Sequence, residues 1–251
     1  MPKNHFIVNF LVFTILSTTL YANKDPLNSP MWNDVKKKFF ADEKFVFDDK
    51  NIKIKVPSFA DNPLQVPIYV DASYFKNATR LLIFADLNAI IPLIDMQLID
   101  FQPIISVNMK IAQGTPLRAA VQDENGLWHV ASKEIKSFGG GCSVASEASG
   151  LDNWESMLGK SKTKVFKLEN KDRIKLSIFH PMDTGLFVGN PEFFIEKIKI
   201  SQNDKHLASI KTYSSVSENP RFLLESKSHK EQYLINLSDT DGNQFSINTK
   251  Y

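Results

Sequence analysis

The stretch LRAAVQDENGLWHVASKEI, residues 117–135, decides the fold class of this chain. An apolar run at 117–121 is followed by the polar sequence Asp-Glu-Asn-Gly at 123–126, and a second apolar run occupies 127–131. Two short apolar runs on either side of a turn that contains glycine are typical of a β-hairpin. The stretch therefore predicts two neighbouring strands that pair in antiparallel fashion.

Similar short runs extend in both directions from this hairpin. Ile52, Ile54 and Val56 alternate with lysines, which is the period of a strand with one buried face. The other predicted strands lie at 66–70, 81–85, 105–111, 165–168, 174–179, 193–200, 207–213, 222–225 and 233–237. Short strands separated by turn signals predict an all-β chain of antiparallel β-sandwiches.

One short helix is predicted before the first strand. Ser29 would be its N-cap and Pro30 its first helical residue, because these residue types favour those positions. Trp32, Val35 and Phe39 follow at helical spacing and would form its buried face.

The apolar pattern weakens between the two groups of strands. Residues 137–162 are rich in Gly, Ser and Lys, with a helical turn predicted at 152–158. We interpret this segment as an arm followed by a linker. It divides the chain into a first β-sandwich domain at 23–136 and a second at 163–251, each of a usual size for one sandwich.

The first 22 residues have the pattern of a secretory signal peptide. Lys3 precedes an apolar run at 6–16, and Leu20-Tyr21-Ala22 predicts cleavage after Ala22. The alternative is a membrane anchor, but the run is shorter than the roughly 20 residues that a spanning helix needs. We expect an exported mature chain without a membrane span.

Charge and residue spacing exclude two classes of function. The chain has 30 basic and 28 acidic side chains, a net charge of +2, and no basic cluster interleaved with aromatics, which argues against nucleic-acid binding. His206 and His229 lie in predicted polar turns where no neighbour completes a set of metal ligands. We therefore predict neither a metal nor a cofactor.

Cys142, the single cysteine, is the candidate functional residue. One cysteine cannot form an internal disulfide, and an unpaired thiol in an exported protein indicates a reactive group or a bond to another chain, such as a Cys142-linked dimer. Gly139, Gly140 and Gly141 precede it, so we interpret the stretch as a flexible arm that exposes the thiol and carries it into a channel of another protein. The alternative is a cysteine in a glycine-rich turn without chemistry.

Six longer stretches carry a family resemblance. They are IKIKVPSFADNPLQVPIYVDA (52–72), LIFADLNAIIPLIDMQL (82–98), the 117–135 hairpin before GGGC (139–142), IKLSIFHPMDTGL (174–186), YSSVSENPRFLLE (213–225) and LSDTDGNQF (237–245). Together they resemble the SoxYZ family of sulfur carriers, with the SoxY half first and both halves fused in one polypeptide.

The resemblance implies a fold, a location and a mechanism. Both halves would be immunoglobulin-like sandwiches, and the protein would work in the bacterial periplasm. Cys142 would hold a sulfur compound such as thiosulfate through an S–S bond. Partner proteins would do the chemistry: c-type cytochromes would conjugate the substrate and a metal-dependent hydrolase would release sulfate. His180, near the domain interface, would tune the Cys142 thiol, or else serve as a structural histidine.

The cysteine's surroundings differ from those in the separate SoxY protein, where it lies in a Gly-Gly-Cys-Gly-Gly tail at the free C-terminus. Here no glycine follows Cys142 directly, and the chain continues into a second domain. This layout resembles the SoxYZ-like carriers associated with quinoprotein (PQQ-dependent) dehydrogenases. A carrier is the predicted function, and two alternatives remain. One is a non-catalytic accessory protein of such a dehydrogenase. The other is an enzyme using Cys142 with His180, for which no ordered third residue is evident.

Overall fold

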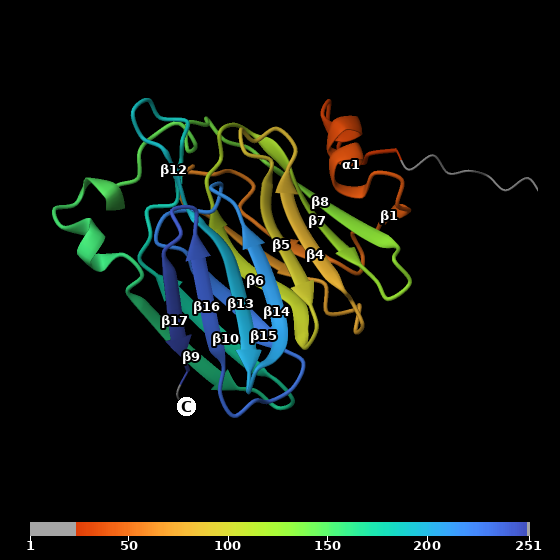
Figure 1. Ribbon diagram of the computed structural model, residues 1–251. Helices are drawn as coiled ribbons and strands as arrows, with labels where there is room; N and C mark the ends of the chain where they lie inside the picture. The colour runs from red at the N-terminus through yellow and green to blue at the C-terminus, as the bar shows by residue number, and fades with distance from the viewer. Residues whose placement is uncertain (1–23, 250–251) are drawn as a thin grey trace, which may run out of the picture.

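Two layers of β-strands make up the described part of the chain (Figure 1). The computed structural model describes residues 24–249, so the predicted signal peptide lies outside the described residues. The N-terminal half, residues 24–136, contains α1 (Trp32–Phe40), β1 (Phe45–Phe47), β2 (Lys53–Lys55), β3 (Val66–Asp71), β4 (Arg80–Ala85), β5 (Pro92–Leu98), β6 (Phe101–Met109), β7 (Thr115–Gln122) and β8 (Trp128–Ile135).

The rest of the chain adds only short helical turns and further strands. The connecting segment, residues 137–160, contains the 3₁₀ helices η1 (Ala148–Gly150) and η2 (Trp154–Met157). The C-terminal half, residues 161–249, contains β9 (Ser161–Lys167), β10 (Asp172–Ile178), β11 (Asp183–Thr184), β12 (Glu192–Phe193), β13 (Ile195–Gln202), β14 (Lys205–Thr212), β15 (Arg221–Ser226), β16 (Leu234–Asp239) and β17 (Gln244–Asn248). No helix among the described residues is long and apolar enough to cross a membrane.

The predicted hairpin and the all-β, antiparallel sandwich class are confirmed. β7 and β8 pair in antiparallel fashion along their whole length. The carboxylate of Asp123 accepts the backbone N–H groups of Asn125 and Leu127 at 2.8 and 3.0 Å, which fixes the turn between the two strands. The strands β1, β5, β11 and β17 were not predicted from the sequence.

Both sheets contain strands from both halves. The nine-stranded sheet has the order β1-β8-β7-β4-β5-β14-β13-β16-β17, and the six-stranded sheet has the order β2-β3-β6-β15-β10-β9. The halves meet where β5 pairs with β14 and β6 pairs with β15, both antiparallel. One hydrophobic core therefore runs through the sandwich, with Met96 opposite Ile210 at the junction. The domain boundaries at 136 and 163 stay a prediction.

Helix α1 begins later than predicted. It starts at Trp32, with Met31 at the N-cap position and no side-chain cap, so the prediction of a Ser29 cap is wrong. The reason is local: the carboxylate of Asp25 accepts the backbone N–H of Ser29 at 2.6 Å and holds this segment in a preceding turn. The helix covers the outer face of the nine-stranded sheet, where Trp32 joins a second hydrophobic cluster with Trp128.

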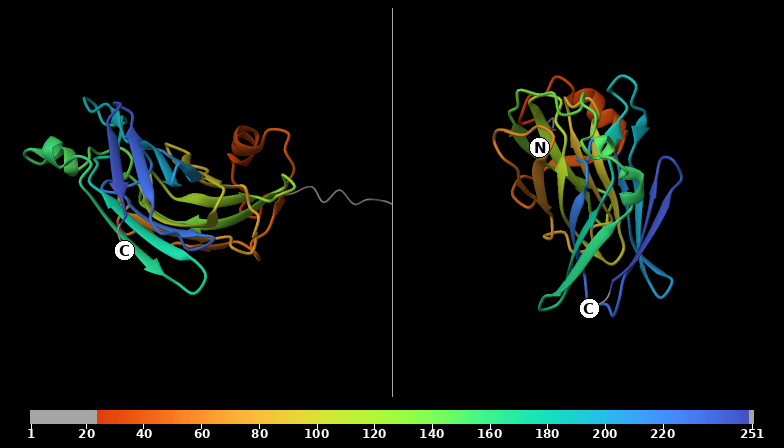
Figure 2. Two further views of the ribbon diagram at one scale, coloured as in Figure 1. Left: turned by 60° about the horizontal axis from the view of Figure 1, so that its bottom comes forward. Right: turned by 90° about the vertical axis from the view of Figure 1, so that its left-hand side faces the viewer.

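A buried arginine joins α1's leading segment to the sheet. Arg118 on β7 has no exposed surface, and its guanidinium forms ion pairs with Asp25 at 2.6 Å and with Asp86 at 2.7 Å. It also donates to the hydroxyl of Ser132 at 2.7 Å. Figure 2 (left) shows α1 and the 3₁₀ helices η1 and η2 at opposite ends of the molecule. Arg118, Asp25 and Asp86 form a three-residue ion cluster between β7, the segment before α1 and the β4–β5 loop. It fixes the N-terminal segment to β7 and to the β4–β5 loop.

Candidate functional site

The thiol of Cys142 is buried, so the prediction of an exposed thiol is wrong. Its S–H group contacts the side-chain oxygen of Asn88 at 3.6 Å and the backbone oxygen of Lys110 at 3.7 Å. Asn88 lies in the β4–β5 loop, and Lys110 directly follows β6. The thiol is therefore buried against the N-terminal half, while the next three residues, 143–145, are exposed. We call the residues around it, Asn88, Lys110 and Thr184, the Cys142 pocket.

The glycines before Cys142 have a packing role in this conformation. The N–H of Gly140 donates to Ala112 at 3.1 Å, and that of Gly141 donates to Ile111 at 2.9 Å. A Cβ atom on Gly141 would lie 2.1 Å from the carbonyl oxygen of Pro63, and one on Gly139 would lie 2.3 Å from that of Ala112. Only glycine permits backbones to approach so closely. The structure thus shows a packed segment where the sequence predicted a flexible arm.

Lys110 is the charged group beside the thiol, and the sequence analysis did not single it out. Its side chain is buried, and its ammonium group donates to the backbone oxygen of Met182 and, at 3.1 Å, to that of Ser214. Burial lowers the pKa of Lys110 to about 8, although Cys142 and nearby carboxylates counteract this. Burial also raises the pKa of the Cys142 thiol, and the Lys110 charge opposes that rise. Lys110 is therefore placed to stabilise a thiolate.

The C-terminal half completes the pocket. The hydroxyl of Thr184 on β11 donates to the backbone oxygen of Cys142 at 2.7 Å. The carboxylate of Asp183 accepts the N–H of Ser146 at 2.9 Å, and that of Glu218 accepts the Ser146 hydroxyl at 2.7 Å. These contacts hold the chain on both sides of the thiol. Moving this segment away from the N-terminal half would break these contacts and the two glycine hydrogen bonds.

His180 does not contact Cys142 among the described residues. Its ring is buried, with Nε2 3.4 Å from the carboxylate of Asp239 and Nδ1 accepting the N–H of Met182 at 3.1 Å. Its ring also packs against Phe193. Burial lowers its pKa to about 4, so the ring is neutral near pH 7. These contacts fit the structural alternative, and the thiol-tuning role predicted for His180 stays untested.

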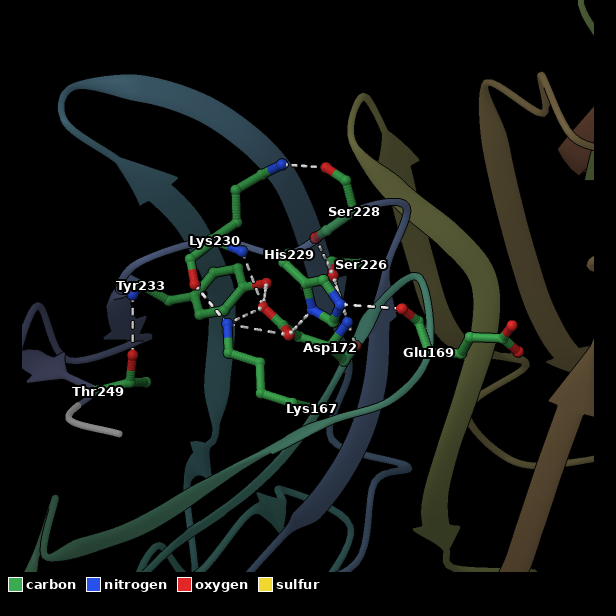
Figure 3. A network of polar contacts seen from close by, with 9 residues as sticks. All are labelled: Lys167, Glu169, Asp172, Ser226, Ser228, His229, Lys230, Tyr233 and Thr249. Carbon is green, nitrogen blue, oxygen red and sulfur yellow. Dashed lines mark hydrogen bonds and ion pairs between the residues drawn. The ribbon is translucent and has the colours of Figure 1, made fainter.

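A second polar cluster lies in the C-terminal half, around the start of β10 (Figure 3). The buried carboxylate of Asp172 accepts hydrogen bonds from Nδ1 of His229 at 2.6 Å, from the hydroxyl of Tyr233 at 2.8 Å and from the N–H of Lys230 at 2.9 Å. It ties the start of β10 to the segment before β16. No group of three or more His, Cys, Asp and Glu side chains within residues 24–249 is placed to hold a metal ion.

Replacing Asp172 with asparagine should cost about 2 kcal/mol of stability near neutral pH. Burial would raise the pKa of Asp172, but its hydrogen bonds outweigh burial and lower that pKa from 3.8 to about 2. A lowered folded-state pKa stabilises above the unfolded pKa, and each unit is worth about 1.4 kcal/mol. The contribution is present above about pH 4 and is lost as the pH falls toward about 2. Urea unfolding at a series of pH values measures it.

Asp204→Asn is the matched control, since Asp204 is exposed in the β13–β14 turn. It should change stability little at any pH. If Asp172→Asn and Asp204→Asn show the same pH dependence, the Asp172 cluster does not stabilise the fold.

Comparisons with known proteins add two family matches. The family model of the sulfur oxidation protein SoxY matches residues 36–142, and that of the sulphur oxidation protein SoxZ matches residues 163–250. No curated protein matches the chain. The SoxY match ends on Cys142 itself.

Two solved structures are similar to parts of the chain. One is the sulfur carrier protein SoxY from Chlorobium limicola f thiosulfatophilum, at 26% identity over 43% of this chain and 96% of that chain, with a TM-score of 0.38. The other is a beta-glycosidase from Bacteroides vulgatus, at 8% identity over 80% of this chain and 24% of that chain, with a TM-score of 0.24.

Proposed function

Because the chain belongs to the SoxYZ family of sulfur-oxidation carriers, with a SoxY and a SoxZ domain in one polypeptide, we propose that Cys142 holds its cargo covalently. The observation that carries the proposal is the surroundings of the only thiol of the chain. It is buried against the backbone oxygen of Lys110, whose buried ammonium group interacts with it electrostatically, and it lies at the point where the SoxY match ends. Nothing in the comparisons favours an accessory protein of a quinoprotein dehydrogenase.

The proposed cargo is thiosulfate, bound through its outer sulfur. The Cys142 sulfur bonds to that sulfur, the thiol proton goes to solvent, and two electrons pass to haem groups of a c-type cytochrome partner. Water then attacks the sulfonate sulfur in a metal-dependent hydrolase partner. Hydrogen sulfate leaves, and a persulfide remains on Cys142. The carrier supplies the Cys142 sulfur and the residues around it, and the partner proteins supply the redox and hydrolytic groups.

The pocket would protect the thiol between the steps of this cycle, and movement of the segment out of the pocket would activate it. Burial raises the thiol pKa and keeps Cys142 protonated and unreactive. When the segment moves out, burial no longer opposes ionisation and the thiol becomes a nucleophile. Export by the predicted signal peptide would place this cycle in the periplasm, where reactive thiols need such protection from oxidation.

The proposal is tested by the intact mass of the protein isolated from its native cells, before and after reduction. We expect a sulfur-containing adduct that maps to Cys142 and leaves on reduction. The Cys142→Ser variant should carry none, and its hydroxyl can still donate to Asn88, so it should fold. A bare thiol that also fails to load with thiosulfate and an oxidising cytochrome would overturn the proposal.

A further inference from the structure

The outer face of the six-stranded sheet carries an open groove lined by cations. The groove has a volume of about 640 Å³ and lies over β9, β10, β15 and β6. Its charged lining residues are all basic: Lys160, Lys162, Lys164, Lys175 and Arg221. The remaining lining is serine, threonine, asparagine, leucine, isoleucine and phenylalanine, and it includes no carboxylate. We call this surface the basic groove.

The strand register concentrates these charges on one face. Lys164 on β9 lies directly opposite Lys175 on β10. Lys162 lies opposite Ser177, whose other neighbour across the sheet is Arg221 on β15. Residues two apart on a strand share a face, so both rows point to the same side of the sheet. All five cations of the groove are exposed.

Fold stability does not explain this arrangement. None of the five cations forms an ion pair within residues 24–249, whereas Arg173 and Lys171 nearby are both paired with Glu225. Like charges directly opposite each other in a sheet are destabilising. The net charge of the whole chain is only +2, so the cluster is a local feature and not a consequence of a basic composition. An unpaired charge cluster in a hollow surface is typical of a binding site for an opposite charge.

The lining favours an acidic protein surface over other anions. Phe179 and Phe222 are the aromatic residues that line the groove, and Phe222 is buried, so the lining offers no row of exposed rings on which successive bases could stack. The face is hollow and has no protruding apolar residue that would enter a lipid layer. The lining combines five cations with neutral side chains and no carboxylate, so its charge complements an acidic surface on another protein.

The basic groove ends close to the segment that carries Cys142. Asn219 lines the groove, and its neighbour Glu218 accepts hydrogen bonds from the hydroxyl of Ser146 and the N–H of Ala148. A protein bound in the groove would therefore lie next to Glu218, one of the residues that hold the Cys142 segment. This would place a bound partner beside the thiol.

We propose that the basic groove is the docking surface for an acidic patch of a partner protein. Docking is electrostatic, so it depends on ionic strength and on the charge of β9 and β10. It requires no reaction at Cys142, so it can be tested apart from cargo binding.

The test measures binding of a short fluorescent polyglutamate peptide to the purified protein by fluorescence anisotropy. The Lys164→Glu/Lys175→Glu variant reverses one cross-strand pair, and it keeps like charges opposite each other, so the sheet should fold as before. The matched control is Lys197→Glu/Lys211→Glu, because Lys197 and Lys211 form the equivalent pair on the nine-stranded sheet. Single-stranded DNA and anionic phospholipid vesicles are the competing probes.

We expect the peptide to bind at low ionic strength and to dissociate as salt is added. The Lys164→Glu/Lys175→Glu variant should bind the peptide about tenfold or more weakly than wild type. The Lys197→Glu/Lys211→Glu control should change the affinity less than about twofold. If the two variants lose the same affinity for the peptide, or if the peptide does not bind the wild-type protein, the proposal of a docking surface is overturned. Tighter binding of the DNA or of the vesicles than of the peptide would overturn the assignment to a protein partner.

Discussion

Replacing Gly141 with alanine is expected to speed the reaction of the Cys142 thiol by about 10- to 100-fold, because overpacking costs about 1–3 kcal/mol. The new Cβ would lie 2.1 Å from the carbonyl oxygen of Pro63 and 2.8 Å from that of Ile111. Both atoms belong to the backbone, so they cannot turn aside. The closed segment should therefore open more often, and each opening exposes the thiol.

The rate is measured with a disulfide reagent that releases a coloured thiolate, at a mildly alkaline pH. Gly150→Ala is the matched control, because a Cβ there meets no atom within 4 Å and its backbone is not in the left-handed region. That variant should react at the wild-type rate. If the wild-type thiol already reacts as fast as free cysteine, the buried conformation is not the one that dominates in solution.

Arg118→Met is expected to destabilise the fold by about 3–5 kcal/mol, a large part of the stability of an ordinary domain. The substitution leaves Asp25 and Asp86 buried without their cation. Burial would raise the pKa of Asp25, and hydrogen bonds from Arg118 and from the backbone of Ser29 and Leu27 hold that pKa below its ordinary value. Without Arg118, burial dominates and the ionised carboxylates destabilise the protein.

Denaturant unfolding of Arg118→Met checks this, with Arg80→Met as the control. Arg80 pairs with Asp95 at 2.7 Å, but its side chain is 39% exposed, so losing that pair should cost less than about 1 kcal/mol. The difference in unfolding free energy between wild type and Arg118→Met should become smaller in acid, since protonation neutralises Asp25 in the variant. Equal losses in Arg118→Met and Arg80→Met would show that the buried cluster contributes no more than a surface pair.

The strands that the sequence predicted are those with a clear apolar run and a turn beside it. β7 and β8 satisfy both conditions, and Asp123 closes their turn as its residue type favours. β5 was missed because it opens with Pro92 and belongs to a long apolar stretch without a turn signal. β5 joins the two halves of the chain by pairing with β14. Because β5 was missed, the sheets that run through both halves could not be predicted either.

The surroundings of Cys142 were harder to predict, because they are formed by contacts between residues far apart in the sequence. A run of glycines before a cysteine is equally consistent with a loose arm and with close backbone packing, and only the positions of Pro63 and Ile111 distinguish them. Lys110 follows a strand like many surface lysines in this chain. Its burial results from Met182 and Ser214, which approach it from the other half.

The junction of β5 with β14 and β6 with β15 has a consequence for how the protein behaves on dilution. Two separate chains joined by such an edge would dissociate at low concentration, whereas strands of one polypeptide meet at a high effective concentration that dilution does not change. The halves are also always present in a one-to-one ratio. The pocket that Asn88 and Thr184 build around Cys142 from opposite halves therefore stays assembled in a single molecule released into a large volume.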